Sequence, residues 1–364
     1  MDQQVKVFLS LASAAVNQTA PDPMIVKDID LDTLFRLASF HQMTAVIATA
    51  LDSAGISDDR FAEEQARAIR KNMILDYERS CLTPKLEANG IWYMPLKGII
   101  LKEYYPGIGM RQMSDNDILF DASRADDVRS IMEDLGFTTV EYGKGHQDDY
   151  QKPPVSNFEM HRMLFSNESD KRLFNYYDDI SDKLIPVNGC ERRLSDEDFY
   201  IYMVAHEFKH YYWNGTGVRS LLDIYVFLKR FRKTLDREYI DAELKKMGIA
   251  DFEKKNRALA VKIFGRRKPP LSEKQEEMLD YFITAGVFGT RQRGIQNSAG
   301  KLGTLRYILQ RVFLPMEAIR KNYPYFYKHK LLIPVLPIYR LVREHKNAST
   351  EVKALKKHIF SKKK

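Results

Sequence analysis

Strand-length apolar runs gather in one stretch of this chain, from residue 91 to residue 165. The turn signal Asn89-Gly90 ends a long helical pattern, and the apolar run IWYMPL begins directly after it. The later segments, in chain order, are a helix at 99–105, a strand at 115–120, a helix at 123–135 and strands at 137–142 and 155–165. This order of elements within about 75 residues predicts a small mixed sheet with helices, not a long doubly wound sheet.

Two local signals lie inside this stretch. Ser123 is predicted to cap the helix at 123–135, and Gly136 is predicted to end it. The polar residues 143–154, which include Gly143, Gly145 and Pro153-Pro154, are predicted to form a loop that connects two strands or closes over them as a lid.

Helical patterns flank the sheet on both sides. Asp58-Asp59 predicts a helix start before residues 61–86, and Ser195 predicts the start of a helix that runs to about Tyr212. Further helices are expected at 218–231 and 236–247. We therefore predict an α+β chain with an N-terminal helical region at 1–88, a core at 89–190, a C-terminal helical region at 191–345 and a basic tail at 346–364.

The net charge of +8 is concentrated in the C-terminal part. From Lys301 onward, 16 Lys and Arg stand against 3 Asp and Glu, so the first 300 residues carry −5. A basic segment favours phosphate-rich partners such as nucleic acid, nucleotides or anionic lipid, although a solvated tail has the same composition. Aromatic residues are dense up to about residue 345, which predicts that this part packs and that the tail beyond it is free.

Cysteine use and hydropathy exclude several classes of protein. The two cysteines, Cys81 and Cys190, form neither a disulfide framework nor a metal-binding CxxC pair. No run of 18 apolar residues is present, so we predict no transmembrane helix. The N-terminus lacks the basic region of a signal peptide, and Asp2 is unfavourable there. We therefore expect a cytoplasmic protein.

Asp115 and Asp117 begin the strand SDNDILF. Alternate side chains of a strand share a face, so both carboxylates point the same way and repel each other. A divalent cation between them removes this repulsion, and Mg²⁺ prefers carboxylate oxygens together with substrate phosphates. Two such ions can stabilise both the attacking and the leaving oxygen of a phosphoryl displacement.

Neighbouring residues strengthen this interpretation, because a lone DxD is common on protein surfaces. Lys97-Gly98 follows the first strand, and a glycine there lets the backbone approach a phosphate closely. Arg111 carries the planar fork that fits phosphate oxygens. Glu159, in the sequence NFEMH that ends at His161, adds a third carboxylate from a later strand.

This combination resembles the DNA-polymerase-β-like nucleotidyltransferase superfamily. More narrowly, three segments resemble a large, mostly uncharacterised bacterial nucleotidyltransferase family. They are PLKGIILKEYYPGIGMRQMSDNDILF, the later E-x-H and the helical segment HEFKHYYWNGTGVRSLLDIYVFL. The resemblance covers about residues 90–235 and, more loosely, the helical regions on either side. It implies a small mixed-sheet polymerase-β-like core and the transfer of a nucleoside monophosphate from an NTP, with ATP as the expected donor, to a hydroxyl of an unknown acceptor.

The resemblance also assigns roles to residues. Asp115, Asp117 and Glu159 would be the catalytic residues and would hold Mg²⁺ or Mn²⁺, with Glu159 also acting as base. Lys97, Gly98 and Arg111 would bind the triphosphate. The chain departs from the superfamily at Ile99, where serine or glycine is usual, and at Asn116, where an apolar residue is usual. A degenerate nucleotide- or RNA-binding protein with the same fold is therefore an alternative.

A second alternative comes from His206 to His210, which spell HExxH. On a helix these two histidines share a face, as zinc metallohydrolases require, and Asp223 offers a third ligand. The resemblance instead makes this helix part of the wall of the nucleotide site.

In the nucleotidyltransferase interpretation, Lys209 and Arg219 are further phosphate contacts, and His161, His206, His210 and Asp223 line the site. A third possibility is that the two histidines of HExxH only bond to Asp223 or Arg219 between packed helices.

Overall fold

The computed structural model describes residues 2–167, 170–267, 269–290, 294, 295, 297 and 312–343. The chain forms two compact units, Met1–Lys209 with Val218–Ile283 and His210–Gly217 with Thr284–Lys364. The predicted basic tail at 346–364 and the segment 301–311 lie outside the described residues. The division of the chain into four segments stays a prediction.

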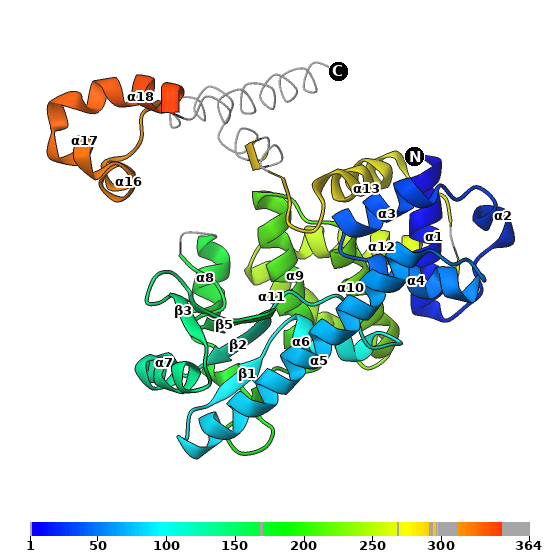
Figure 1. The fold of residues 1–364 in the computed structure, drawn as a ribbon, viewed down its shortest axis with the longest axis horizontal. Helices are drawn as coiled ribbons and strands as arrows, with labels where there is room; N and C mark the ends of the chain where they lie inside the picture. The colour runs from blue at the N-terminus through cyan, green and yellow to red at the C-terminus, as the bar shows by residue number, and fades with distance from the viewer. Residues whose placement is uncertain are drawn as a thin grey trace. The chain divides into compact units, whose positions relative to one another are not determined.

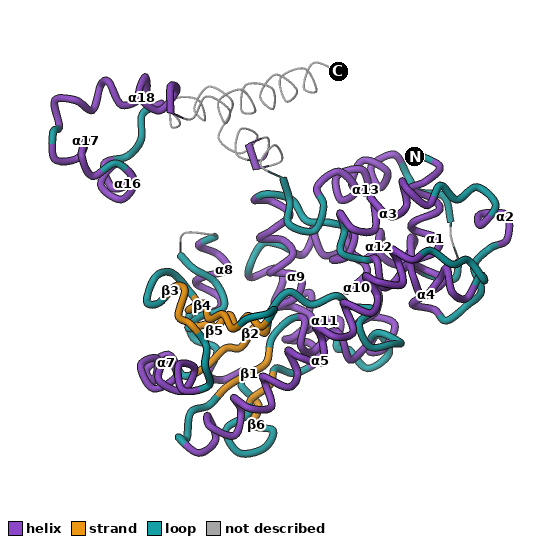
Figure 2. Tube along the Cα trace, in the orientation of Figure 1, coloured by secondary structure: helices purple, strands orange, loops and turns teal. Residues whose placement is uncertain are grey.

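The first unit is built on a five-stranded mixed sheet, shown in Figure 1 and in orange in Figure 2. Its strands are β1 Tyr93–Pro95, β2 Asn116–Phe120, β3 Thr138–Glu141, β4 Gln147–Lys152 and β5 Ser156–His161. They lie in the order β1-β2-β5-β4-β3. Strands β2 and β5 are parallel, and the other neighbouring pairs are antiparallel. The predicted α+β class with a mixed sheet and flanking helices is confirmed.

Five helices precede the sheet: α1 Gln3–Asn17, α2 Pro23–Val26, α3 Leu31–Phe40, α4 Thr44–Ser53 and α5 Asp59–Ala88. Asp58 caps α5 as predicted, because its carboxylate accepts hydrogen bonds from the backbone N–H groups of Arg60 and Phe61. Within the sheet region lie α6 Gly98–Leu101, η1 Lys102–Tyr104, η2 Ala122–Arg124 and α7 Ala125–Asp134.

After the sheet the chain is again mainly helical. The elements are α8 Lys171–Tyr177, η3 Ser181–Lys183, the strand pair β6 Ile185–Pro186 and β7 Arg192–Arg193, α9 Asp196–Trp213, α10 Val218–Phe231, α11 Arg237–Lys246, α12 Ala250–Phe264 and α13 Glu273–Ala285. The helices predicted at 195–212, 218–231 and 236–247 are α9, α10 and α11. The break between α9 and α10 falls at the predicted residues 214–217.

One face of the sheet packs against α5 and α7. Its apolar side chains come from alternate positions of β2 and β5, namely Ile118, Phe120, Phe158 and Met160. They meet Leu75 and Leu82 of α5 and Val128 and Met132 of α7. Because side chains alternate along a strand, Asp117 and Glu159 are turned to the opposite face of the sheet.

Two local predictions were wrong. Residues 147–152, predicted to be loop, form β4, which pairs with the whole of β5. Its sequence QDDYQK contains one apolar residue, so hydrophobic alternation gave no strand signal. Ser123 is not the cap of the next helix, since Asp121 accepts the hydrogen bond from the backbone N–H of Ser123 at the start of η2.

In the second unit, the described C-terminal elements are α16 Met316–Asn322, α17 Pro324–Lys328, η4 Lys330–Val335 and α18 Leu336–Arg343. The apolar run predicted to be too short for a membrane span, LLIPVLPI, forms most of η4 and the start of α18. In the described part of the chain, no helix has both the length and the apolar character that a membrane crossing needs.

Candidate functional site

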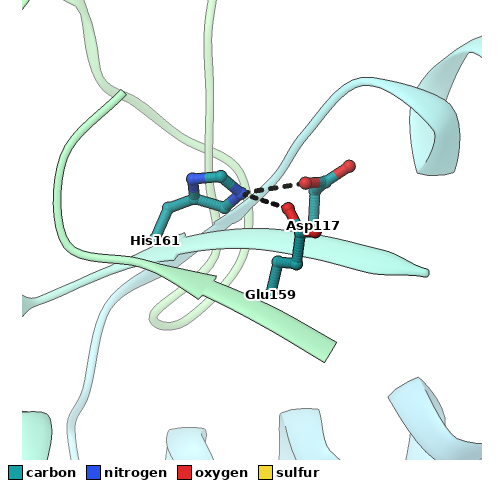
Figure 3. Close-up of side chains that lie close together, drawn as sticks. All are labelled: Asp117, Glu159 and His161. Atoms are coloured by element: carbon teal, nitrogen blue, oxygen red, sulfur yellow. Dashed lines mark hydrogen bonds and ion pairs between the residues drawn. The ribbon is translucent and has the colours of Figure 1, made fainter. Parts of the chain in front are cut away.

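Three side chains from the two central strands point toward one another (Figure 3). The parallel register places Asp117 of β2 directly opposite Glu159 of β5, and His161 lies two residues further along β5. The His161 Nε2 lies 2.8 Å from the Asp117 Oδ1 and 3.6 Å from the Glu159 Oε2. One ligand atom from each residue lies within 4.8 Å of the other two, so the three could hold a metal ion.

Lys97 supplies a positive charge to this group. Its Nζ donates to the same Asp117 Oδ1 at 2.7 Å. Burial raises the pKa of Asp117, but the nearby Lys97 ammonium and the hydrogen bonds from His161 and Lys97 hold it well below its usual range. Lys97 also has a φ of 42°, a conformation that residues other than glycine rarely adopt. Backbone strain of this kind gathers at functional sites.

Asp115 lies just before β2 and is partly buried. Burial and the negative charges of Asp117 and Glu159 raise the pKa of Asp115 to about 7. Asp115 is not a member of the group of three close ligand atoms. It nevertheless interacts electrostatically with the Asp117 and Glu159 carboxylates. Three carboxylates thus share the site with one directly paired ammonium, that of Lys97.

The sheet and its carboxylates fall inside a match to a known family. A family model described as an uncharacterised nucleotidyltransferase matches residues 27–265. The chain belongs to this nucleotidyltransferase family. No curated protein and no solved structure matches the chain.

Asn116, one of the two departures from the nucleotidyltransferase superfamily, faces away from the carboxylates. Its Nδ2 donates to the Leu75 backbone carbonyl at 2.9 Å, and its Oδ1 accepts from Arg79 at 3.2 Å. Both partners belong to α5. The polar side chain between the two aspartates therefore serves packing against α5, and the departure leaves the site face of β2 unchanged.

Gly98 lies against Arg111, and this contact explains the glycine. A Cβ at Gly98 would lie 2.4 Å from the Arg111 Nη1 and 2.7 Å from the Met113 Sδ. The sequence suggested that the glycine admits a phosphate; in the structure the same space admits a guanidinium. Ile99, the other departure, is buried in the core between the sheet and α5.

The Arg111 guanidinium is bound by protein. Its Nε and Nη2 donate to the two carboxylate oxygens of Asp223 at 2.9 and 3.0 Å, and the Tyr105 hydroxyl donates to Asp223 at 2.8 Å. This network joins the loop before β2 to helix α10. The structure thus places Arg111 and Asp223 in one buried ion pair beside Gly98, and the phosphate contact of Arg111 stays a prediction.

Lys209 and Arg219 differ in their surroundings. Lys209 makes no ion pair with any described residue, and its Nζ lies 5.8 Å from the centre of the Phe165 ring. Burial and the charge of Lys97 lower the pKa of Lys209 to about 8, although Glu159 and Asp117 oppose this. Arg219 donates to the Gln42 Oε1 at 2.5 Å and to the backbone carbonyl of Gln112 at 3.2 Å.

The HExxH residues do not assemble a zinc site in the described part of the chain. The candidate metal group found there contains neither His206 nor His210. Glu207, which would be the base of a zinc hydrolase, is buried and accepts hydrogen bonds from the Ser220 Oγ and the Asn256 Nδ2. Asp223, the expected third ligand, is bound to Arg111.

Sequence reasoning assigned less to His161 than the geometry does. His161 was expected only to line the site, but it belongs to the group of three ligand atoms. The i, i+2 spacing of Glu159 and His161 on one strand was the signal, because it places both on one face. Asp149, on the strand β4 that the sequence did not predict, lies opposite Glu159 but outside this group of ligand atoms, and its carboxylate accepts a hydrogen bond from Gln147.

Proposed function

We propose that this protein transfers a nucleoside monophosphate from an NTP to a hydroxyl of an acceptor, with a divalent metal ion held by Asp115, Asp117 and Glu159. The observation that carries the proposal is the parallel register that sets Asp117 opposite Glu159. Membership of a nucleotidyltransferase family supports the same reaction type.

The donor set fits a divalent cation. Oxygen ligands from carboxylates are those that Mg²⁺ and Mn²⁺ prefer. Burial and, next, the negative charges of Asp117 and Glu159 raise the pKa of Asp115, so a cation among these carboxylates would favour its ionised form. When bound, such an ion would neutralise charge on the phosphate oxygens and on the leaving pyrophosphate.

Glu159 is suited to receive the acceptor's proton. Its side chain is 32% exposed, whereas that of Asp117 is 8% exposed, so of these two carboxylates Glu159 is the one that solvent and an acceptor can reach. In the reaction, the acceptor oxygen bonds to the α-phosphorus, and the bond from that phosphorus to the β-phosphate oxygen breaks. Pyrophosphate leaves with the electron pair, and the proton passes to Glu159.

Lys97 and Lys209 are the cations that we assign to the phosphates. Lys97 contacts the carboxylate group directly, and Lys209 lacks a carboxylate partner among the described residues. Arg111 and Arg219 have protein partners, so we assign them to holding the site together. Catalysis of phosphoryl transfer rests mainly on such positioning and charge neutralisation.

Label transfer tests the proposal. The protein is incubated with each NTP labelled at the α-phosphate, with Mg²⁺ or Mn²⁺ and with cell extract as the source of acceptor, and pyrophosphate release is measured in parallel. We expect labelled product from the wild-type protein and a loss of at least about a hundredfold in Asp117→Asn.

Asp149→Asn is the matched control, because Asp149 pairs with Glu159 across strands β4 and β5 but does not belong to the group of ligand atoms. It should retain transfer. NTP binding without transfer under all these conditions would instead favour the degenerate binding protein. Stoichiometric zinc that is lost in His206→Ala and His210→Ala would favour the zinc hydrolase.

A further inference from the structure

His161 brings a nitrogen donor into a group of carboxylate oxygens. The imidazole is 2% exposed, so its position is fixed by the surrounding protein. Its Nε2, not its Nδ1, faces the Asp117 and Glu159 oxygens, and Figure 3 shows the three side chains converging from β2 and β5. The three-carboxylate pattern of the superfamily gives no role to this histidine, which belongs to the E-x-H segment that resembles the narrower family.

The separations of these atoms match the edges of a metal coordination shell. In an octahedral shell with ligands about 2.1 Å from the ion, neighbouring ligand atoms lie roughly 3 Å apart. The Nε2 lies 2.8 Å from one carboxylate oxygen and 3.6 Å from the other. The ligand atoms of all three residues lie within 4.8 Å of one another, and the Lys97 Nζ bonds the same Asp117 oxygen at 2.7 Å. Shifts of the Glu159 side chain and of the Lys97 ammonium would therefore let one ion contact all three atoms.

Ligand type then decides which ion the group favours. Carboxylates and water suit both Mg²⁺ and Mn²⁺, so the two carboxylates do not distinguish these ions. Imidazole nitrogen binds transition ions more strongly than it binds Mg²⁺, so of the two ions Mn²⁺ gains more from a histidine ligand. We propose that the His161 Nε2 is a direct metal ligand beside Asp117 and Glu159, and that the site prefers Mn²⁺ to Mg²⁺. This inference rests on the proposed function and names the ion for that same site.

A different role for His161 makes different predictions. If the Nε2 only donates a hydrogen bond to Asp117, it orients a ligand and does not touch the ion. Both roles weaken metal binding when His161 is lost. A direct ligand, in contrast, leaves a nitrogen nucleus bonded to the ion, and pulsed electron paramagnetic resonance of bound Mn²⁺ detects that nucleus without any measurement of activity.

The experiment uses the full chain with Mn²⁺ or Mg²⁺ alone. His161→Gln retains an amide N–H that can donate to Asp117 but removes the imidazole. His146→Gln is the matched control, because its ring lies 5.7 Å from that of His161 yet it is not in the donor group. Calorimetric titration gives the affinity of each protein for Mn²⁺ and for Mg²⁺. Thermal melting without metal shows whether each variant folds.

We expect a nitrogen nucleus coupled to the bound Mn²⁺ in the wild-type protein and in His146→Gln, and no such coupling in His161→Gln. We also expect His161→Gln to weaken Mn²⁺ binding by roughly tenfold or more and Mg²⁺ binding much less. If His161→Gln does not fold, wild-type protein labelled with ¹⁵N-histidine gives the answer, because the coupling must change from ¹⁴N to ¹⁵N.

Mn²⁺ binding that depends on Asp117 but shows no histidine nitrogen overturns the inference and leaves the proposed function intact. A nitrogen coupling that survives in His161→Gln also overturns it. If the wild-type protein binds neither ion, the proposed function itself fails.

Discussion

Asp223 and Asp117 are both buried carboxylates of the first unit, but their surroundings differ in charge balance. Asp223 is matched by one guanidinium that meets both its oxygens, and Tyr105 completes its hydrogen bonds. Asp117 shares one ammonium, that of Lys97, with two further carboxylates. A buried charge is costly unless it is paired. The charge of Asp223 is therefore balanced within the chain, whereas at Asp117 the proposed metal ion would supply the positive charge that Lys97 alone does not.

The largest loss of stability is expected when the ion pair of Arg111 and Asp223 is broken. Asp223→Ala leaves the Arg111 guanidinium buried without a counter-charge, so the free energy of unfolding should fall by about 3–5 kcal/mol. Urea denaturation measures this loss. Asp223→Asn, which retains a polar partner for Tyr105, should be less damaging. A loss below about 1 kcal/mol in Asp223→Ala would contradict the structural role assigned to the pair.

Glu207 sharpens the comparison, because no described Lys, Arg or His forms an ion pair with it and burial instead favours its protonated form. Burial raises the pKa of Glu207 to about 7. The folded protein then holds a proton that the unfolded chain loses above about pH 4.5. Stability should therefore fall by about 3 kcal/mol as the pH rises from 4.5 to 7, and it should change little above that range.

Glu207→Gln tests this effect. The Asn256 Oδ1 has no hydrogen-bond partner among the described residues, and it can accept from the new amide once the Asn256 side-chain amide is flipped. The variant and the wild-type protein should be similar in stability at pH 4.5, and the variant should be more stable at pH 8. Equal stability at pH 8 would show that Glu207 is ionised in the folded protein without cost.

Gly98→Ala probes the close contact of Gly98 with Arg111, the partner of Asp223; Gly98 itself follows Lys97, the partner of Asp117. The new methyl group would overlap the Arg111 Nη1, and Asp223 fixes this guanidinium through its Nε and Nη2, so we expect a loss of about 1–3 kcal/mol. Gly107→Ala is the control, because a Cβ there meets Met110 at an ordinary 3.4 Å. Thermal melts of both variants measure the difference. If Gly98→Ala melts with the wild-type protein, the close approach of Arg111 does not explain the glycine.

Sequence patterns predicted most of the fold, and the reasons for the misses are specific. Helix α10 has the bounds that its apolar spacing predicted, and α5 begins at its predicted acidic cap. Strand β4 was missed because its pairing with β5 uses backbone groups, and its side chains are mostly polar. Hydrophobic alternation detects strands that bury one face, so a polar strand next to an acidic site escapes it.

The carboxylate residues of the site could be predicted from the sequence, but the ion pairs that surround them could not. The spacing of Asp115 and Asp117 and the later Glu159 identified the carboxylates. No pattern along the chain showed that Arg111 would meet Asp223, because the two lie 112 residues apart and come together through the packing of α10. The same holds for the bond from Lys97 to Asp117, which depends on the pairing of neighbouring strands.

The smallest effect on stability, and the most direct test of the unbalanced site, is expected from Glu159→Gln. This change removes one of the mutually repelling carboxylates, so the metal-free protein should melt at the same temperature as the wild-type protein or slightly higher. Addition of Mn²⁺ at 100 times its dissociation constant should stabilise the wild-type protein by about 2.7 kcal/mol. Glu159→Gln should show little of this stabilisation, and the neighbouring Asp149→Asn should retain it.

The decisive measurement is thus the melting temperature of Glu159→Gln and the wild-type protein, each with and without Mn²⁺. We expect the metal-free proteins to melt alike and the melting temperature of the wild-type protein to rise strongly on addition of the ion. A large loss of stability in metal-free Glu159→Gln, or an equal shift in both proteins, would contradict the claim that these carboxylates form a site completed by a metal ion.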